Sequence, residues 1–475
     1  MSQGSPAADP PPEAGYSIRR CVIEAFRGEH HDYTRAPLQR AIILLAVPMV
    51  MEMLMESLFA ISDVFWVSHL GKEAVAVVGL TESVMALVYA VAIGLAIAAS
   101  AVVARRIGEK RPGEASEAAG QAIILGLGLA LCIGAALGLN ARAILGAMGA
   151  DAATIAQGAS FTRIMLGGNA TVFLIFLINA IFRGAGDPVF SMRTLWLANG
   201  LNIILGPCFI FGLGPFPRLG VTGAAVATNL GRGIGVLYQL WNLAGGRSRI
   251  RVGLRNLRPN LTSMAAVMRP AWSGMGQFLI GTTSWIGLFK ILSLFGSSAL
   301  AGYTIAIRLV ISALLPAWGL SNAASTLVGQ NLGAGHPERS EGAVRTAVRL
   351  NVMFLGSIAV VFLAAAPWIV GAFARDPEVY RNGVAALRIV SLGFPLYAAG
   401  MCYEAAFNGA GDTWTPTRLN FYWQWLGQVP VAWFLSRGLG LGPVGVYIAV
   451  PASFAGLAIA GGVLFRRGGW KRKRV

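Results

Sequence analysis

Apolar runs alternate with short polar segments along almost the whole chain. Twelve of these runs are long enough for a helix to cross about 30 Å of hydrocarbon, because a helix rises about 1.5 Å per residue. The pattern predicts an all-helical integral membrane protein with twelve transmembrane helices. The expected spans are 38–66, 74–104, 119–139, 158–182, 188–213, 220–244, 263–294, 299–329, 344–366, 380–406, 415–437 and 442–466.

The composition supports the membrane assignment. The chain has 475 residues, of which 55% are hydrophobic and only 12% are charged, and its mean hydropathy is +0.63. A soluble protein of this length could not cover so much apolar sequence with so few charges. The four cysteines lie far apart and follow no disulfide or metal spacing. These features exclude a secreted disulfide-rich scaffold.

The basic residues are distributed as topology signals. The net charge is +17, which would fit a nucleic-acid partner, but most Lys and Arg residues lie in the N-terminal segment, the even-to-odd loops and the C-terminal tail. Positive charge marks the cytoplasmic side of membrane proteins, so both termini are expected in the cytoplasm. The basic segments 247–262 and 467–475 are interpreted as a cytoplasmic linker and tail that meet lipid headgroups, with no role in nucleic-acid binding. Residues 1–37 are Pro-rich and charged, show no cleavable signal peptide, and are expected to be flexible and cytoplasmic.

The chain repeats itself at a constant offset of about 225 residues. The clearest pair is RGAGDP at 183–188 and NGAGDT at 408–413. The sequence predicts two six-helix lobes, 38–246 and 263–466, related by a rotation near 180° about the membrane normal. Both GAGD segments are interpreted as tight turns between helices, since they lack the lysine of a phosphate-binding loop. Further pairs are Gly71 with Gly296, Gly94 with Gly319, Gly108 with Gly333, Pro112 with Pro337, and Gly220 with Gly445.

The first span carries three carboxylates on one helical face. At about 100° per residue, Glu52, Glu56 and Asp63 fall within about 40° of one another. Acidic side chains inside a membrane usually face a polar interior and mark an ion or substrate path. Pro48 lies near the same face and removes a backbone hydrogen bond, which permits a bend. The alternative for Glu52 and Glu56 is a simple contact with a neighbouring helix or with water.

These motifs resemble the multidrug and toxic compound extrusion (MATE) transporters over roughly residues 38–466. The matching segments, in order, are LAVPMV, ISDVFWVSHLG, VARRIGEKRPGEA, FRGAGDP, LNIILGPCFIFG, LGVTGAAVATN, STLVGQNLGAGHPERS and FNGAGDTWTP. The resemblance implies a V-shaped protein of two lobes around a central cleft. It also implies export of small organic, often cationic, compounds in exchange for H⁺ or Na⁺ by alternating access, in a bacterial inner membrane.

The resemblance assigns the coupling site to the N-terminal lobe. It implies that Asp63 belongs to a cation site, with Asn202 and Thr228 as further oxygen ligands. The chain departs from the family pattern at Gly206, where LNxxLDP carries an aspartate. Loss of that carboxylate leaves Na⁺ at Asp63 with fewer oxygen ligands, so H⁺ coupling is favoured over Na⁺.

Three further intramembrane charges are candidates for the cleft or for a gate. Glu82 and Arg308 are expected on opposite sides of the cleft at similar depth, where they would form a gate or would each pair within their own lobe. Glu404 is expected either to contribute to a polar site in the C-terminal lobe or to cap a helix near the surface. The substrate-cleft candidates are Glu52, Glu56, Glu82 and Glu404.

No enzymatic site is predicted. The chain has only four histidines, with no metal spacing and no serine-centred motif, and needs no cofactor beyond the coupling ion. Two other functions remain open: a flippase for a lipid-linked precursor from the same wider superfamily, and a membrane scaffold without transport. We expect a monomer.

Overall fold

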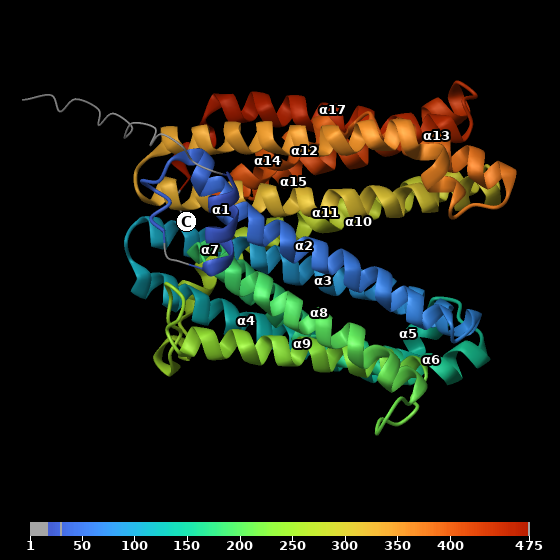
Figure 1. Ribbon diagram of the computed structural model, residues 1–475, viewed down its shortest axis with the longest axis horizontal. Coiled ribbons are helices and arrows are strands. Elements are labelled where there is room, and N and C mark those ends of the chain that lie inside the picture. The colour runs from blue at the N-terminus through green and yellow to red at the C-terminus, as the bar shows by residue number, and fades with distance from the viewer. Residues whose placement is uncertain (1–17, 29–30, 474–475) are drawn as a thin grey trace, which may run out of the picture.

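The structure is a computed structural model that describes residues 18–28 and 31–473. These residues form helices joined by short loops, and long helices run side by side along the longest axis (Figure 1). The first half contains α1 (Ile18–Arg27), α2 (Leu38–Ser68), α3 (Lys72–Gly108), α4 (Pro112–Leu139), α5 (Ala141–Ala147), α6 (Ala152–Gly167), α7 (Ala170–Ala185), α8 (Pro188–Phe211), α9 (Val221–Ala244) and η1 (Leu254–Leu257). The second half contains α10 (Leu261–Ser293), α11 (Ser297–Gly333), α12 (Pro337–Gly371), α13 (Pro377–Ser391), α14 (Phe394–Gly409), α15 (Trp414–Asn420), η2 (Phe421–Gln428), α16 (Val429–Trp433), η3 (Phe434–Gly438), α17 (Pro443–Arg467) and η4 (Gly469–Arg472).

Each of the twelve predicted spans falls on a long helix or on a run of consecutive helices. Among the described residues, eight helices are long and apolar enough to cross a membrane, or nine when α13 and α14, which are bent by 52°, are taken as one span. The remaining predicted spans correspond to α9, α10 and the segment from α15 to η3, which carry more polar residues. Large apolar side chains point outward on many helices, among them Ile204, Leu237, Ile286, Val360 and Ile459. Such an apolar exterior fits hydrocarbon as the surrounding solvent.

The helix ends follow from local sequence. Pro112 and Pro337 begin α4 and α12. Proline fits the first position of a helix because a backbone N–H there would have no hydrogen-bond partner within the helix. The side chain of Asn260 accepts hydrogen bonds from the backbone N–H groups of Thr262 and Ser263 and so caps α10. Asp151 and Asp376 cap α6 and α13 in the same way.

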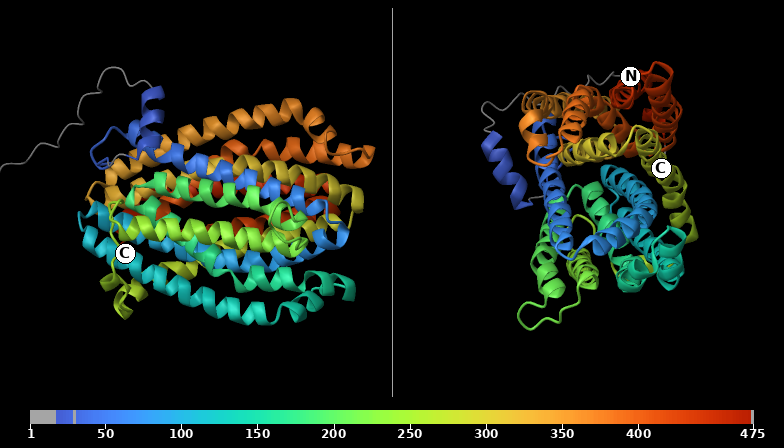
Figure 2. Two further views of the ribbon diagram at one scale, coloured as in Figure 1. Left: turned by 60° about the horizontal axis from the view of Figure 1, so that its bottom comes forward. Right: turned by 90° about the vertical axis from the view of Figure 1, so that its right-hand side faces the viewer.

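The two halves form two lobes that meet at one end and diverge at the other. In Figure 1, α2–α9 lie in the lower group and α10–α17 in the upper group, and the groups separate toward the right-hand side. The helix α1 and the C-terminal η4 lie at the left-hand end, where the lobes meet (Figures 1 and 2). The predicted two-lobed all-helical fold is therefore confirmed.

The internal repeat is visible in backbone geometry. Gly71 and Gly296 precede α3 and α11 with φ angles of 99° and 97°, a region that favours glycine. A Cβ at Gly184 would lie 2.6 Å from the carbonyl oxygen of Ser100, and one at Gly409 would lie 2.2 Å from that of Ser325. Both contacts require glycine, and both sets of positions keep the 225-residue offset.

One predicted glycine pair is wrong by three residues. Gly220 precedes α9 with φ 58°, and its conformational counterpart before α17 is Gly442, with φ 59°. Gly445 instead corresponds to Gly223, since each packs its Cα against the backbone at the end of the preceding helical segment. The register shifts because the loop after η3 is shorter than the loop after α8.

The lobes contact each other through glycines related by the same repeat. A Cβ at Gly108 would lie 2.0 Å from the carbonyl oxygen of Gln330, and one at Gly333 would lie 2.2 Å from that of Arg105. These two contacts bring α3 and α11 together at the end that carries α1. A Cβ at Gly319 would likewise lie 2.7 Å from the carbonyl oxygen of Met49 on α2. Side chains larger than hydrogen would force the lobes apart here.

Hydrogen bonds cross between the lobes at the same end. The Thr326 hydroxyl donates to the carbonyl oxygen of Arg183 at 3.1 Å, and the Gln330 amide donates to that of Gly184 at 3.0 Å. Both donors lie on α11, and both acceptors lie in the last turn of α7. The closed end is thus held by backbone contacts and by side-chain hydrogen bonds, which include these two.

Candidate functional site

The two GAGD segments are turns that anchor the chain leaving each lobe. Gly186 and Gly411 have φ angles of 86° and 81°, which confirms the predicted tight turns. Asp187 accepts hydrogen bonds from the Ser248 hydroxyl at 2.6 Å and from the backbone N–H of Arg249 at 2.7 Å. Asp412 lies 3.3 Å from the ammonium of Lys473. Each carboxylate therefore holds the segment that follows the last helix of its lobe.

Glu52, one of the cleft candidates, lies inside the N-terminal lobe, where it contacts a neighbouring helix. Its side chain is 1% exposed, and its Oε1 accepts hydrogen bonds from Arg183 at 2.6 Å and from Asn179 at 3.2 Å. Asn179 is held in turn by the Gln239 amide, which donates to its Oδ1 at 2.6 Å. Burial of the Glu52 charge is tolerated because a guanidinium compensates it.

Glu56 belongs to a second ion pair one turn further along α2. Arg232 of α9 is 4% exposed, and its Nη2 lies 3.6 Å from Glu56 Oε1. Asn199 of α8 donates to Glu56 Oε2 at 2.8 Å. Arg232 also donates to the Tyr89 hydroxyl at 3.1 Å and lies 5.3 Å from the centre of the Phe59 ring. Arg232 is therefore an ion-pair partner of Glu56 within the N-terminal lobe.

Asp63 lies beyond these pairs along α2 and is partly buried. It interacts electrostatically with Glu82 of α3, a like charge, and with Arg232 of α9. No ion pair within 4.0 Å joins Asp63 to either residue. Asp63 is thus a partly buried carboxylate that interacts with a cation without a direct ion pair.

Asn202 and Thr228 lie together, as the resemblance implied. Asn202 Nδ2 donates to Thr228 Oγ1 at 2.8 Å, and both side chains are buried. A Cβ at Gly206 would come no closer than 4.0 Å to Asn202 Oδ1 or to Trp66. The position that carries aspartate in the family pattern therefore has room for a side chain. Neither Asn202 nor Thr228 forms a hydrogen bond with Asp63.

Glu82 and Arg308 come from different lobes. Arg308 of α11 interacts electrostatically with Glu82 of α3, with no ion pair within 4.0 Å between them. The interaction places opposite charges on the two sides of the space between α3 and α11.

Glu404 has no ion-pair partner among the described residues. It lies on α14, and its Oε1 is buried without a hydrogen-bond partner. Asn420 of α15 forms a hydrogen bond with the carboxyl group. One turn along α14, Asn408 donates to Gln277 Oε1 at 3.3 Å, while its own Oδ1 is buried and unpartnered.

This cluster in the C-terminal lobe is the repeat counterpart of the Glu52 cluster. At the 225-residue offset, Glu52 corresponds to Gln277, and Arg183 corresponds to Asn408. In the N-terminal lobe the carboxylate, Glu52, is on α2. In the C-terminal lobe it is Glu404 on α14, at the position that corresponds to Asn179. Because an asparagine replaces the arginine, the C-terminal lobe keeps a buried carboxylate without an internal cation.

The helical segment opposite Glu404 is irregular. The turns η2 (Phe421–Gln428) and η3 (Phe434–Gly438) are π-helical, a rare conformation that is frequent at functional sites. On η2, Gln424 donates to Asn420 Oδ1 at 3.1 Å, and its Oε1 is buried and unpartnered. The Nε2 of Gln428 is also buried and unpartnered. Two amide groups of η2 therefore have a buried polar atom without a hydrogen-bond partner.

Arg183, Asn179, Asn199 and Gln277 were not predicted as functional neighbours of the acids. A signal was present in the sequence, because the 225-residue offset places polar residues at matching positions of both lobes. Within residues 18–28 and 31–473, no group of three or more His, Cys, Asp or Glu side chains is arranged to hold a metal ion.

Known proteins share this arrangement over nearly the whole chain. The MatE family profile matches twice, at residues 48–208 and 274–434, which begin 226 residues apart. A probable multidrug resistance protein NorM of Thermotoga maritima is 26% identical over 441 residues, covering 92% of this chain and 94% of that protein. An FAD transporter of Shewanella oneidensis is 25% identical over 354 residues, covering 74% and 78%.

A solved structure gives the same result for the fold. The outward-facing conformation of a multidrug resistance MATE family transporter superposes with a TM-score of 0.87 at 27% identity, covering 93% of this chain and 98% of that chain. The double profile match covers more than half of the sequence and follows the two lobes. The chain therefore belongs to the MATE family of membrane transporters and is not an enzyme.

Proposed function

We propose that this protein exports small organic cations in exchange for H⁺ by alternating access between its two lobes. The observation that carries the proposal is Asp63, a partly buried carboxylate in the N-terminal lobe without a direct ion pair. Glu52 and Glu56, on the same helix, are each paired with an arginine. Asp63 is therefore the acid of α2 that is free to exchange a proton for a cation.

The coupling ion follows from the ligands around Asp63. Na⁺ needs several oxygen ligands and compensation of its charge, and Gly206 supplies neither. Asn202 and Thr228 are hydrogen-bonded to each other. This pairing needs no metal ion, which supports H⁺ as the coupling ion. We propose that protonation of Asp63 weakens its attraction for a bound cation and for Arg232, and that α2 then bends at Pro48. Binding that is mutually exclusive is sufficient for exchange.

Three other features belong to the proposal. Glu404, which has no internal cation, contributes a polar site for the cationic substrate in the C-terminal lobe. Glu82 and Arg308 attract each other across the lobes and pair when the open end closes. The protein lies in a bacterial inner membrane with both termini in the cytoplasm. The segment 247–262 links the lobes 38–246 and 263–466. The protein acts as a monomer.

Export of an anionic, lipid-linked precursor is less well supported. A pyrophosphate group would need free basic side chains in the cleft. Arg183 and Arg232 of the N-terminal lobe are instead neutralised by Glu52 and Glu56. A scaffold role without transport is not supported either, since the chain belongs to a transporter family.

The proposal is tested with purified protein in liposomes under an imposed pH or Na⁺ gradient. Transport of ethidium should follow the pH gradient, and Asp63→Asn should abolish it. The control is Glu378→Gln, which changes an exposed acid in the first turn of α13. Asp63 is not the coupling residue if the Asn variant exports ethidium at the normal rate under a pH gradient. Export driven by Na⁺ at equal pH would contradict the assignment of H⁺.

A further inference from the structure

The helix α1 precedes the first membrane span and runs across the direction of the bundle. Its last residue, Arg27, is followed by Leu38 at the start of α2 after a short connection. In the right-hand view of Figure 2 the long helices are seen end-on, while α1 is seen from the side at the edge of the bundle. A helix in this position and direction lies parallel to the plane of a membrane, at the level where the first span begins.

One face of α1 is fixed to the protein. Cys21 and Ala25 are both 3% exposed. Glu24 forms an ion pair with Arg40 of α2 at 2.7 Å, and the guanidinium of Arg193 on α8 donates to the carbonyl oxygen of Phe26 at 3.2 Å. These contacts hold the orientation of α1 about its own axis.

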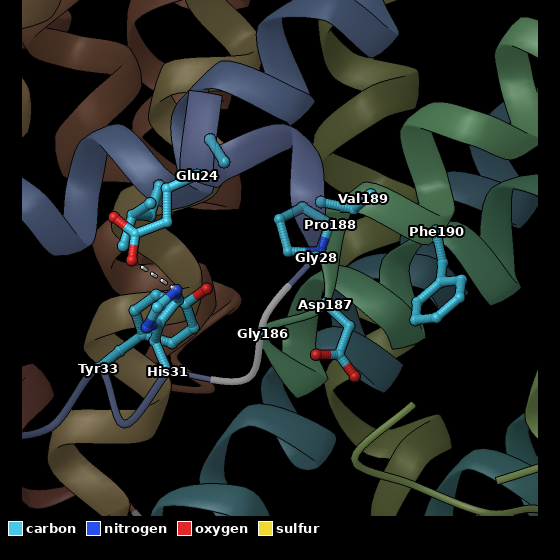
Figure 3. A pocket seen from close by; sticks show the side chains of 11 residues that line it. Glu24, Gly28, His31, Tyr33, Gly186, Asp187, Pro188, Val189 and Phe190 are labelled. Atoms are coloured by element: carbon cyan, nitrogen blue, oxygen red, sulfur yellow. Dashed lines mark ion pairs between the residues drawn. The ribbon is translucent and has the colours of Figure 1, made fainter. Parts of the chain in front are cut away.

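The connection from α1 to α2 is anchored as well. Figure 3 shows Glu24, His31 and Tyr33 beside Asp187 and the start of α8. Glu24 Oε1 lies 3.4 Å from His31 Nε2. Tyr33 is buried, and this burial raises the pKa of its hydroxyl, which therefore stays neutral. The guanidinium of Arg249 lies 5.1 Å from the Tyr33 ring centre and donates to the carbonyl oxygen of His31.

The opposite face of α1 combines positive charge with apolar surface. At about 100° per residue, Arg19, Arg20, Ile23, Phe26 and Arg27 fall within an arc of about 120°. Ile23 is 48% exposed and Phe26 is 37% exposed. Arg19 and Arg20 are exposed and form no ion pair with the described residues. Glu24, the acid of the helix, borders this face and is compensated by its ion pair with Arg40.

We infer that this face of α1 binds the anionic headgroups of membrane phospholipids, with Arg19 and Arg20 at the phosphates and with Ile23 and Phe26 inserted between the upper acyl chains. The positive charge of the face favours an anionic partner. Ile23 and Phe26 favour a partner that has an apolar layer next to its charged groups, as a phospholipid bilayer does. An apolar protein surface would leave Arg19 and Arg20 without compensation. A free anion would leave Ile23 and Phe26 in water. The inference concerns lipid binding and does not depend on the transported substrate or on the coupling ion.

The test places an environment-sensitive fluorophore on the outward face of the full chain. Ile23→Cys is labelled in a Cys132→Ser, Cys208→Ser background, since the remaining thiols of Cys21 and Cys402 are buried. The labelled protein is reconstituted in nanodiscs of phosphatidylcholine alone or with phosphatidylglycerol. We expect blue-shifted emission, and quenching by lipids that carry a nitroxide below the headgroup, to be strong only with phosphatidylglycerol.

Charge removal then separates specific binding from general lipid contact. Arg19→Gln with Arg20→Gln should weaken the affinity for dioctanoyl-phosphatidylglycerol in micelles by about fivefold for each arginine, because one basic residue near an anionic surface contributes about 1 kcal/mol. The control Arg142→Gln with Arg218→Gln removes two exposed charges at the other end of the bundle, one on α5 and one in the loop after α8, and should have no effect. Correct folding is checked by size-exclusion chromatography and ethidium export.

Three results would overturn the inference. The fluorophore could remain in water in both lipid mixtures, or it could insert equally in both, which would exclude recognition of charge. It could also be shielded without lipid and become exposed after removal of residues 1–16. That result would show that the N-terminal segment covers this face.

Discussion

Removal of the Arg183 guanidinium should destabilise the N-terminal lobe far more than removal of a surface arginine. Arg183→Met keeps a long side chain but leaves Glu52, which is 1% exposed, with Asn179 as its hydrogen-bond donor. The Oε2 of Glu52 has no partner even with the arginine present. Breaking a buried ion pair by removing one partner costs roughly 3–5 kcal/mol, because the remaining charge is uncompensated.

The matched control is Arg345→Met in the exposed pair with Glu341. Arg345 is 67% exposed and pairs at an i,i+4 spacing on α12. Such pairs contribute about 0.3–0.5 kcal/mol. The double variant Glu52→Met with Arg183→Met should recover most of the stability lost by Arg183→Met, since no buried charge remains. The hydrogen bond from Thr326 to the carbonyl oxygen of Arg183 uses the backbone and should persist in every variant.

Free energies of unfolding would be measured in mixed detergent micelles by titration with SDS. The reasoning fails if Arg183→Met costs less than about 1 kcal/mol, or if the double variant loses the sum of the two single effects. Either result would mean that water or a rearranged side chain compensates Glu52.

Four further substitutions test the site and the closed end. Glu404→Gln removes the carboxylate, and Asn408→Arg compensates it with a neighbouring cation. Each should weaken the binding of ethidium, measured by fluorescence anisotropy, by roughly ten- to hundredfold, because a hydrogen bond to a charged group contributes about 1.5–3 kcal/mol. Unchanged affinity in both variants would exclude Glu404 as a substrate contact. Gly333→Ala should destabilise the closed end by about 1–3 kcal/mol and increase labelling of cysteines placed there, whereas Gly113→Ala, where a Cβ meets nothing within 4 Å, should not. Gly206→Asp should make export depend on Na⁺; retained Na⁺ independence would contradict the argument from ligand number.

Much of the fold follows from the sequence because the membrane imposes a simple rule. Each backbone polar group must be satisfied within its own helix, so the apolar spans translate directly into helices. The 225-residue offset also paired Gly108 with Gly333, and the structure brings the lobes together at these two glycines. The offset failed at Gly220 because loop length is not constrained by packing, and the true counterpart is Gly442.

The site was harder to predict because acids of one helical face have different partners. Helical spacing placed Glu52, Glu56 and Asp63 together, but it could not show that Arg183 on α7 and Arg232 on α9 reach the first two. Those contacts depend on how α7 and α9 pack against α2, which periodicity does not encode.

The internal repeat nevertheless carries information about charge that neither lobe shows by itself. Gly108 and Gly333 keep the lobes in contact at equivalent positions, so the two halves share one backbone design at the closed end. Within that design the N-terminal lobe encloses a carboxylate with Arg183, while the C-terminal lobe encloses Glu404 with Asn408 in the place of the arginine. A buried carboxylate without an internal cation is most stable when it binds a proton or a cation from outside. The asymmetry therefore favours a division of roles, in which exchangeable charge is handled at Asp63 and Glu404 and the ion pairs of Glu52 and Glu56 keep the N-terminal helices in place.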